Sequence, residues 1–108
     1  MTSPFRSVDL RDARKDSARE LGELVTTAMG TMHAVVHGNG PDVVLIHGVT
    51  DNAHTWHDVQ GSLAGIARTH AIDLPGHGLS DIPAKPLTAR QMAEWVLSYL
   101  DTARVERA

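Results

Sequence analysis

Two short stretches of the chain combine residue types that can take part in catalysis or ligand binding. Residues 42–46 are apolar after the first and lead into residues 47–49 (His-Gly-Val), and the strand-like run at residues 70–74 leads into the turn at residues 75–80. A buried strand that feeds a polar, glycine-containing loop is typical of functional positions at the carboxyl ends of strands in α/β proteins. A backbone N–H in such a loop can be aimed at the charge that develops on a substrate carbonyl.

The second stretch contains Asp73, His77 and Ser80, which match the residue types of a nucleophile, a base and an orienting acid. The three side chains of such a relay must converge in space. Three residues within one short turn seldom can, so we do not expect a local catalytic triad. We interpret Asp73 and Ser80 instead as side chains that hydrogen-bond the backbone of their own loop.

The seven histidines suggest metal binding, with His54 and His57 three residues apart on an expected helix and His33 and His37 four apart on an expected strand. A catalytic zinc needs three protein ligands with second-shell support, and the sequence has no His-Glu-x-x-His. Residues 76–81 lack the third glycine of a dinucleotide fingerprint, and no Gly-Lys-Ser/Thr is present. We therefore predict neither a metal site nor a cofactor.

The strands that would hold the two loops can be predicted from hydrophobic periodicity. Residues 31–37 alternate between two faces and predict a strand, and residues 38–41 (Gly-Asn-Gly-Pro) predict a turn. Residues 42–46 predict the next strand. Its unbroken apolar run is typical of a strand that is buried on both faces of a parallel sheet.

A helix is predicted after this strand, because Trp56, Val59 and Leu63 recur at intervals of three and four residues. Residues 69–74 predict a third strand. The span of residues 43–74 fits one strand-helix-strand crossover, for which a right-handed parallel arrangement is the rule.

A second helix is predicted over residues 89–103. Thr88 and Gln91 have the spacing of a capping box, in which the threonine hydroxyl and the glutamine side chain satisfy backbone N–H groups reciprocally. Apolar residues at helical spacing more often line a packing face than a cofactor site. The residues expected to be buried are Met92, Trp95, Val96, Tyr99 and Leu100.

Residues 1–28 are expected to form a charged N-terminal leader that is either helical or a solvated extension. Six residues loosely fit one helical face. They are Leu10, Ala13, Ala18, Leu21, Leu24 and Val25.

Composition narrows the class of partner. The 108 residues include no cysteine, which excludes disulfides and thiolate chemistry. The net charge of −3 is too small to give a strong electrostatic field that would attract nucleic acid or anionic membranes. The chain has no apolar run of membrane-spanning length and no secretory signal in its charged N-terminus. We expect a cytoplasmic protein with a small-molecule or protein partner.

The order of these motifs resembles the N-terminal part of the α/β-hydrolase superfamily. The resemblance rests on His47-Gly48 after a buried strand, Trp56 on the following helix, and an Asp-Leu-Pro-Gly-His-Gly-x-Ser turn at residues 73–80. It extends from about residue 29 to the end of the chain. Residues 47–52 are most similar to those of cofactor-free esterases, enol-lactonases and haloperoxidase-like members.

The resemblance implies an α/β fold with an incomplete sheet of about three strands, mixed to parallel, and two or three helices. It also implies that the backbone N–H of Val49 contributes to an oxyanion hole. The other matching positions shape the two loops, with glycine where a side chain would obstruct. They are His47, Gly48, Asp73, Gly76, Gly78 and Ser80.

The sequence departs from the family pattern at the nucleophile. A hydrolase of this kind needs a Gly-x-Ser-x-Gly elbow, followed in chain order by an acid and a histidine. None of the six serines, at positions 3, 7, 17, 62, 80 and 98, has glycine two residues away on both sides. Residues 29–108 are therefore expected to be the part of a hydrolase domain that precedes the elbow, inactive by itself against ester, lactone or similar acyl substrates.

A second interpretation is a non-catalytic α/β module that self-associates or complements another chain. By resemblance, the strand at residues 42–46 would lie between the strand at residues 69–74 and the elbow strand. Without the elbow strand it becomes an apolar open edge, which favours pairing with another chain.

Overall fold

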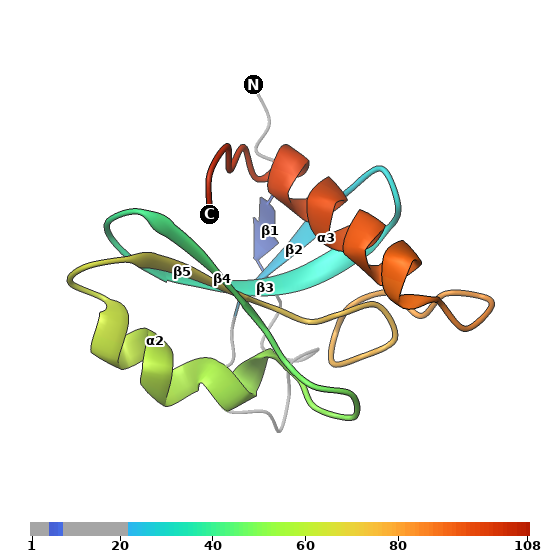
Figure 1. Ribbon diagram of the computed structural model, residues 1–108, viewed down its shortest axis with the longest axis horizontal. Coiled ribbons are helices and arrows are strands. Elements are labelled where there is room, and N and C mark those ends of the chain that lie inside the picture. Colours follow the sequence, from blue (N-terminus) through green and yellow to red (C-terminus); the bar gives the residue numbers. More distant parts are fainter. Residues whose placement is uncertain (1–4, 8–21) are drawn as a thin grey trace.

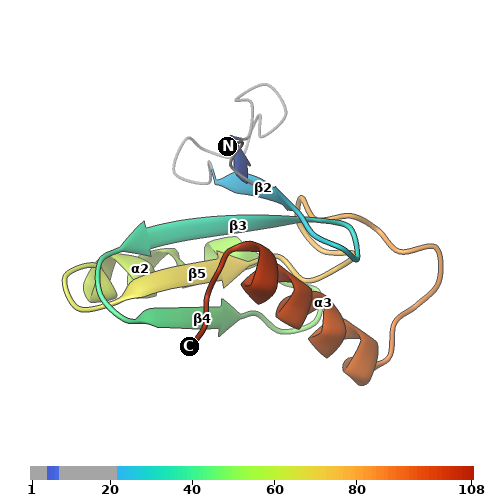
Figure 2. The same cartoon turned by 90° about the horizontal axis from the view of Figure 1, so that it is seen from above.

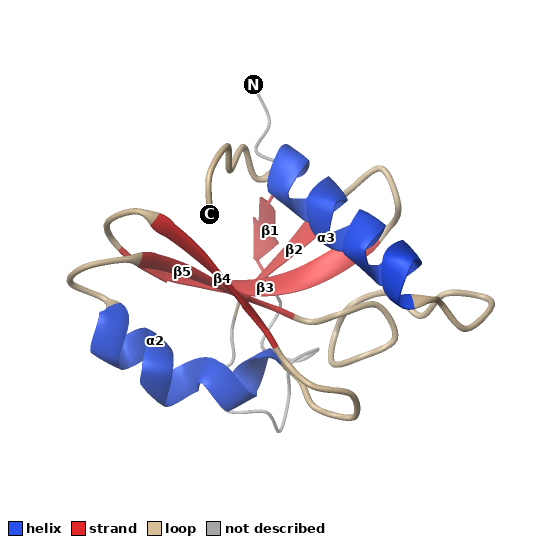
Figure 3. Cartoon of the chain, viewed as in Figure 1, coloured by secondary structure: helices blue, strands red, loops and turns tan. Residues whose placement is uncertain are grey.

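The computed structural model describes residues 5–7 and 22–108, which form a five-stranded mixed sheet with a helix on each face. Figure 1 shows the two α-helices on opposite sides of the strands, and Figure 3 shows the same view by secondary structure. The predicted α/β class is confirmed. The elements are β1 (Phe5–Ser7), β2 (Glu23–Thr26), β3 (Thr31–Gly38), β4 (Asp42–Ile46), the 3₁₀-helix η2 (Ala53–Trp56), α2 (His57–Leu63), β5 (Arg68–Ile72) and α3 (Ala89–Thr102).

The spatial order of the strands is β1-β2-β3-β5-β4. Only β4 and β5 pair in parallel, with Ile46 opposite Ile72, and the other neighbours are antiparallel. η2 and α2 make the crossover between β4 and β5, as the helical periodicity predicts. Because β4 and β5 run the same way, their carboxyl ends lie at the same end of the sheet. The loops that follow Ile46 and Ile72 are therefore neighbours.

The N-terminal prediction needs correction where it falls on described residues. Leu24 and Val25 belong to strand β2 and not to a helix, and Val25 is fully buried opposite Met32 of β3. A tight turn joins β2 to β3. It is closed by a hydrogen bond from the N–H of Thr27 to the carbonyl of Gly30 at 2.9 Å. β1 and β2 give the sheet five strands instead of about three, and β2 begins before residue 29. The rest of the expected stripe, Leu10 to Leu21, lies outside the described residues.

Strand β4 lies at the edge of the sheet, as expected in the absence of an elbow strand. Figure 2 shows it as the outermost strand beyond β5. The prediction that it is buried on both faces is wrong for this chain, because its residues are half-buried and Ile46 is 49% exposed. An apolar run predicts that a strand is buried, but it does not identify the strand or helix that covers it.

The core lies between the sheet and α3. Thr88 and Gln91 form the predicted capping box, with the Gln91 N–H donating to the Thr88 hydroxyl at 3.1 Å and the Thr88 N–H donating to the Gln91 side-chain oxygen at 2.8 Å. Trp95 and Tyr99 are buried against the sheet, and Val96 packs at the margin of this cluster. The predicted packing stripe is confirmed for Trp95, Val96, Tyr99 and Leu100, which belong to this cluster or pack against it, whereas Met92 is half-buried and is not part of it. No helix in the described residues is long and apolar enough to cross a membrane.

Candidate functional site

The loop after β4 is fastened to the turn after β5 by a buried histidine. The Nδ1 of His47 donates to the carbonyl oxygen of Gly48 at 2.7 Å, and its Nε2 accepts from the N–H of Leu74 at 3.0 Å. With both nitrogens bound to backbone groups and the side chain buried, His47 has no free nitrogen to act as a general base. Its contacts are those of a residue that sets the shape of the loop.

Val49 lies at the exposed tip of this loop, with 78% of its surface accessible. Its N–H makes no hydrogen bond to any described residue, whereas the next three N–H groups are engaged. Thr50 donates to the Nε2 of His77 at 3.2 Å, Asp51 to the Gly48 carbonyl at 3.1 Å, and Asn52 to the side chain of Asp51 at 2.9 Å. The loop therefore offers one backbone donor to a ligand at residues 49–52.

The space beside Gly48 is open. A Cβ atom at this position would meet no atom within 4 Å in the described part of the chain. Because the residue next to the free donor has no side chain, a ligand or another backbone segment can approach the loop closely here.

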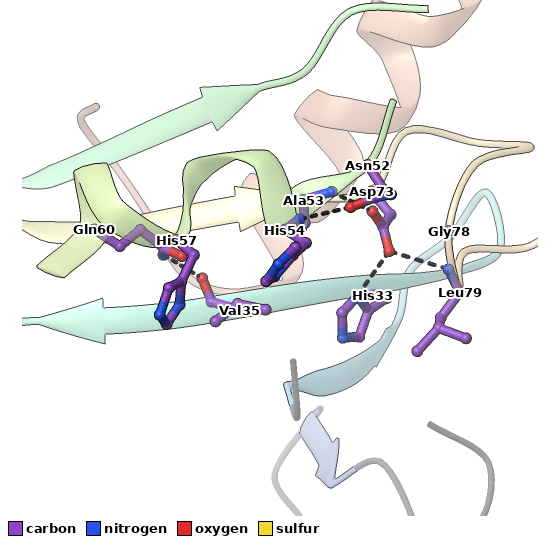
Figure 4. A pocket seen from close by; sticks show the side chains of 10 residues that line it. All are labelled: His33, Val35, Asn52, Ala53, His54, His57, Gln60, Asp73, Gly78 and Leu79. Atoms are coloured by element: carbon purple, nitrogen blue, oxygen red, sulfur yellow. Dashed lines mark hydrogen bonds and ion pairs between the residues drawn. The ribbon is translucent and has the colours of Figure 1, made fainter. Parts of the chain in front are cut away.

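Asp73 organises the turn after β5. Its carboxylate accepts hydrogen bonds from the Nδ1 of His33 at 2.8 Å, the N–H of Ala53 at 2.6 Å and the N–H of Leu79 at 3.0 Å (Figure 4). Burial alone would raise the pKa of Asp73, but the hydrogen bond from His33 and those from the two backbone groups outweigh it and hold the pKa below its usual range. The side chain is an ionised anchor that ties β3, η2 and the turn together.

The turn around Asp73 requires its glycines. A Cβ on Gly78 would overlap the Asp73 carboxylate, and Gly78 has a φ of 52°. Gly76 has a φ of 80°, a region that favours glycine. Ser80 is buried, donating its hydroxyl to the carbonyl oxygen of Asp73 at 2.6 Å and accepting from the N–H of His33 at 2.9 Å.

The side chains of Asp73, His77 and Ser80 do not form a relay. The imidazole of His77 contacts the carbonyl of Pro75 and the N–H of Thr50, and the Ser80 hydroxyl contacts backbone groups. This arrangement agrees with the sequence-based argument against a local triad.

His33 is a site residue that sequence reasoning considered only as a metal ligand. β3 and β5 pair with Ala34 opposite Ile72, which places His33 beside Asp73 across 40 residues of sequence. The alternation of residues 31–37 shows which face His33 occupies, but the register that selects its partner is a tertiary property. In the described part of the chain, no group of three or more His, Asp or Glu side chains could hold a metal ion.

A cavity of about 300 Å³ lies between η2, α2 and β3. Figure 4 shows His54, His57 and Gln60 along one side of it. Val49 is not among the lining residues. Three polar side chains of the lining already have partners, since Asp73 binds His33 and the amide of Gln60 donates to the Val35 carbonyl at 2.8 Å. We therefore place the candidate site at the loop after β4.

The curated relatives include a named enzyme. The pimeloyl-(acyl-carrier protein) methyl ester esterase of Nitrosomonas europaea is 44% identical over 52 residues, which cover 48% of this chain and 21% of that protein. An uncharacterized protein of Mycobacterium tuberculosis is 38% identical over 72 residues, covering 67% of this chain and 21% of that protein. The matched segment thus spans about a fifth of the length of these relatives.

Solved structures share the fold. A hydrolase from Pseudomonas aeruginosa superposes with a TM-score of 0.73 at 28% identity, covering 79% of this chain and 33% of that one. An epoxide hydrolase from an endophytic Streptomyces superposes with a TM-score of 0.70 at 29% identity, covering 81% of this chain and 27% of that one.

The family comparison covers the crossover from β4 to β5 and the two loops described above. The model of the alpha/beta hydrolase family matches residues 43–106, which is more than half of the chain. The protein therefore belongs to the alpha/beta hydrolase family.

Proposed function

We propose that this chain supplies the oxyanion-hole donor and its supporting loops to an active site that hydrolyses an ester, a lactone or a similar acyl substrate. The observation that carries the proposal is the N–H of Val49, which lies just beyond the carboxyl end of β4 without a hydrogen-bond partner in the described residues. The relationship to a methyl ester esterase supports the choice of substrate class.

The direction of this donor is set by the peptide group to which it belongs. The N–H of Val49 shares a planar trans peptide with the carbonyl of Gly48, so the two groups point in opposite directions. The Gly48 oxygen accepts from the Nδ1 of His47 at 2.7 Å and from the N–H of Asp51 at 3.1 Å. These bonds hold the donor in place before a substrate arrives, which is the condition for stabilising an oxyanion at low reorganisation cost.

The nucleophile of the proposed site must come from outside these 108 residues, because no serine here lies in a Gly-x-Ser-x-Gly sequence. Ser80 is buried and hydrogen-bonded to the backbone, which leaves it unsuited to attack a substrate. The 108-residue chain alone is therefore inactive in this proposal, and a segment that carries the elbow, in the same or another polypeptide, completes the site.

The first test is an esterase assay of the 108-residue chain with an activated acyl ester. We expect no turnover above a control without protein. Turnover that is abolished by Ser80→Ala would overturn the proposal and restore the local triad.

The second test uses a chimera in which residues 43–106 replace the matching segment of the Nitrosomonas europaea esterase. Val49→Pro removes the N–H, and we expect it to lower kcat by about 10²- to 10³-fold, the usual effect of losing one oxyanion-hole donor. Val49→Ala keeps the N–H and should retain most of the activity. Circular dichroism of both variants reports whether the fold is intact, and a Val49→Pro chimera that is folded and fully active would exclude Val49 as the donor.

A second candidate function is a module that pairs with another chain without catalysing a reaction. The open edge of β4 favours it, since Ile46 is 49% exposed and β4 has a strand on one side only. A chain that acquires no esterase activity in the chimera but forms a defined complex through this edge would support this alternative over the first.

A further inference from the structure

The imidazole of His77 connects the turn after β5 to the loop after β4. Its Nδ1 lies 3.0 Å from the carbonyl oxygen of Pro75, and its Nε2 lies 3.2 Å from the backbone nitrogen of Thr50. The turn fixes the residue itself, because the N–H of His77 donates to the carbonyl of Leu74 at 2.9 Å. The ring packs against the ring of His47, with 4.9 Å between the centroids and a tilt of 54°.

These two contacts require one protonation state of His77. A carbonyl oxygen only accepts, so Nδ1 must carry a proton to bond Pro75. A backbone N–H only donates, so Nε2 must be unprotonated to bond Thr50. The ring is therefore neutral in this arrangement, with its proton on Nδ1. A second proton, on Nε2, would remove the acceptor that Thr50 uses.

Thr50 has a φ of 70°, which is uncommon for a residue with a β-branched side chain. Such a conformation persists where the surrounding structure holds it. The bond from its N–H to His77 is the one hydrogen bond that Thr50 makes within the described residues. This bond orients the peptide group between Val49 and Thr50.

We propose that His77 is a positioning residue for the Val49 donor, whose neutral imidazole holds the Val49–Thr50 peptide through Nε2. His47 holds the preceding peptide through the Gly48 oxygen at 2.7 Å, so the two histidines fix the peptide groups on both sides of the Val49 Cα. The inference rests on the proposed role of Val49. Protonation of His77 releases the restraint on the Val49–Thr50 peptide and leaves the donor held only through the Gly48 oxygen.

The carboxylates of the two loops already accept hydrogen bonds, and that of Asp51, next to Thr50, accepts from the N–H of Asn52 at 2.9 Å. Within the described residues, the titratable side chain in ring contact with His77 is His47, and both of its nitrogens bind backbone. In the same turn, the carboxylate of Asp73 binds His33, and that of Asp81 accepts from the N–H of Thr31 at 2.8 Å.

The test is nuclear magnetic resonance of the ¹⁵N-labelled 108-residue chain. Long-range proton–nitrogen spectra at neutral pH should show His77 with its proton on Nδ1 and an unprotonated Nε2. The protection factor of the Thr50 amide against hydrogen exchange should fall as His77 becomes protonated. A proton on Nε2 at neutral pH, or Thr50 protection that stays constant while His77 titrates, would overturn the proposal.

Two variants separate the acceptor from the packing of the ring. His77→Phe keeps a ring against His47 but removes the acceptor, and should lower the Thr50 protection factor by about two- to tenfold, the loss expected for one hydrogen bond. His77→Gln offers a side-chain oxygen and should retain Thr50 protection, without the fall at low pH that is expected of the unsubstituted chain. Unchanged Thr50 protection in a folded His77→Phe chain contradicts the proposal. If that variant does not fold, the tautomer and pH measurements on the unsubstituted chain still decide.

These readouts are independent of catalysis, so the two proposals can fail separately. If Thr50 protection falls as His77 is protonated but the Val49→Pro chimera is active, His77 restrains the loop and Val49 is not the oxyanion-hole donor. An inactive Val49→Pro chimera combined with a proton on Nε2 of His77 would keep the donor and overturn the positioning role.

Discussion

At the scale of single residues, Asp73 shows how a buried carboxylate can be structural while standing in a motif that suggests catalysis. Its carboxylate accepts hydrogen bonds from three groups of its own fold, the imidazole of His33 and the N–H groups of Ala53 and Leu79. A carboxylate that receives three hydrogen bonds is stabilised in its charged form, which explains the lowered pKa despite burial. These contacts join the turn that carries His77 to β3 and η2.

We predict that Asp73→Asn lowers the free energy of unfolding by about 1.5 to 3 kcal/mol at pH 7, the range for hydrogen bonds to a charged group. Because the folded-state pKa of Asp73 is below its ordinary value of 3.8, this stabilisation is present above that value and is lost as the pH falls through the folded-state pKa. Urea unfolding at pH 7 and pH 3 should show a smaller difference in stability between the two proteins at pH 3.

Glu94→Gln is the matched control, because Glu94 is an exposed acid on α3. Its effect should stay within about 0.5 kcal/mol at both values of pH. A difference between wild type and Asp73→Asn that is equal at pH 7 and pH 3 would contradict the assignment of the ionised form.

At the scale of elements, α3 is joined to the sheet by two consecutive side-chain hydrogen bonds in addition to its apolar stripe. The Nε2 of His70 donates to the Asp42 carboxylate at 2.8 Å, and its Nδ1 accepts from the hydroxyl of Tyr99 at 2.8 Å. Burial raises the pKa of Tyr99, so its hydroxyl remains a donor. These hydrogen bonds link β4, β5 and α3. They therefore fix how the helix lies on the parallel pair of strands.

Tyr99→Phe should lower the free energy of unfolding by about 1 to 3 kcal/mol, because the buried Nδ1 of His70 loses its donor while the ring remains. Chemical denaturation monitored by tryptophan fluorescence measures this change. Leu97→Ala on the exposed side of α3 is the control and should cost much less, since Leu97 is 59% exposed. A Tyr99→Phe protein as stable as the unsubstituted one would indicate that the hydroxyl contributes nothing.

At the scale of the whole molecule, the sheet of the described residues ends in an apolar strand, β4, that has a neighbour on one side only. β4 has unpaired backbone groups on its outer side, and Ile46 and Val49 expose apolar surface beside them. Such an edge is a template for another strand, whether from an elbow-bearing segment or from a second copy.

The 108-residue chain should therefore self-associate in solution, and Ile46→Lys should shift it toward the monomer, because a charged side chain on an edge strand opposes pairing. Sedimentation velocity over a range of concentrations measures both. Ile66→Lys is the control, since Ile66 is also exposed but precedes β5 at the other end of the sheet. A stable monomer without substitution would contradict the prediction and argue against an open β4 edge.

The features that the sequence determined by itself are local in the chain. The strand periodicities, the crossover helix and the capping box of Thr88 and Gln91 depend on residues only a few positions apart, and all of them were predictable. The family resemblance was predictable for a similar reason, because the spacing of His47, Trp56 and the turn after β5 is written along one continuous segment.

The contacts that give the site its shape join distant positions, and only the tertiary structure decided them. His33 meets Asp73 across 40 residues, and Thr50 meets His77 across 27. Strand β2, with four residues, is too short for its periodicity to separate it from a helix. The register, the strand neighbours and the open edge all depend on which segments pack together. That pairing joins distant positions and cannot be read from the side-chain types of one segment.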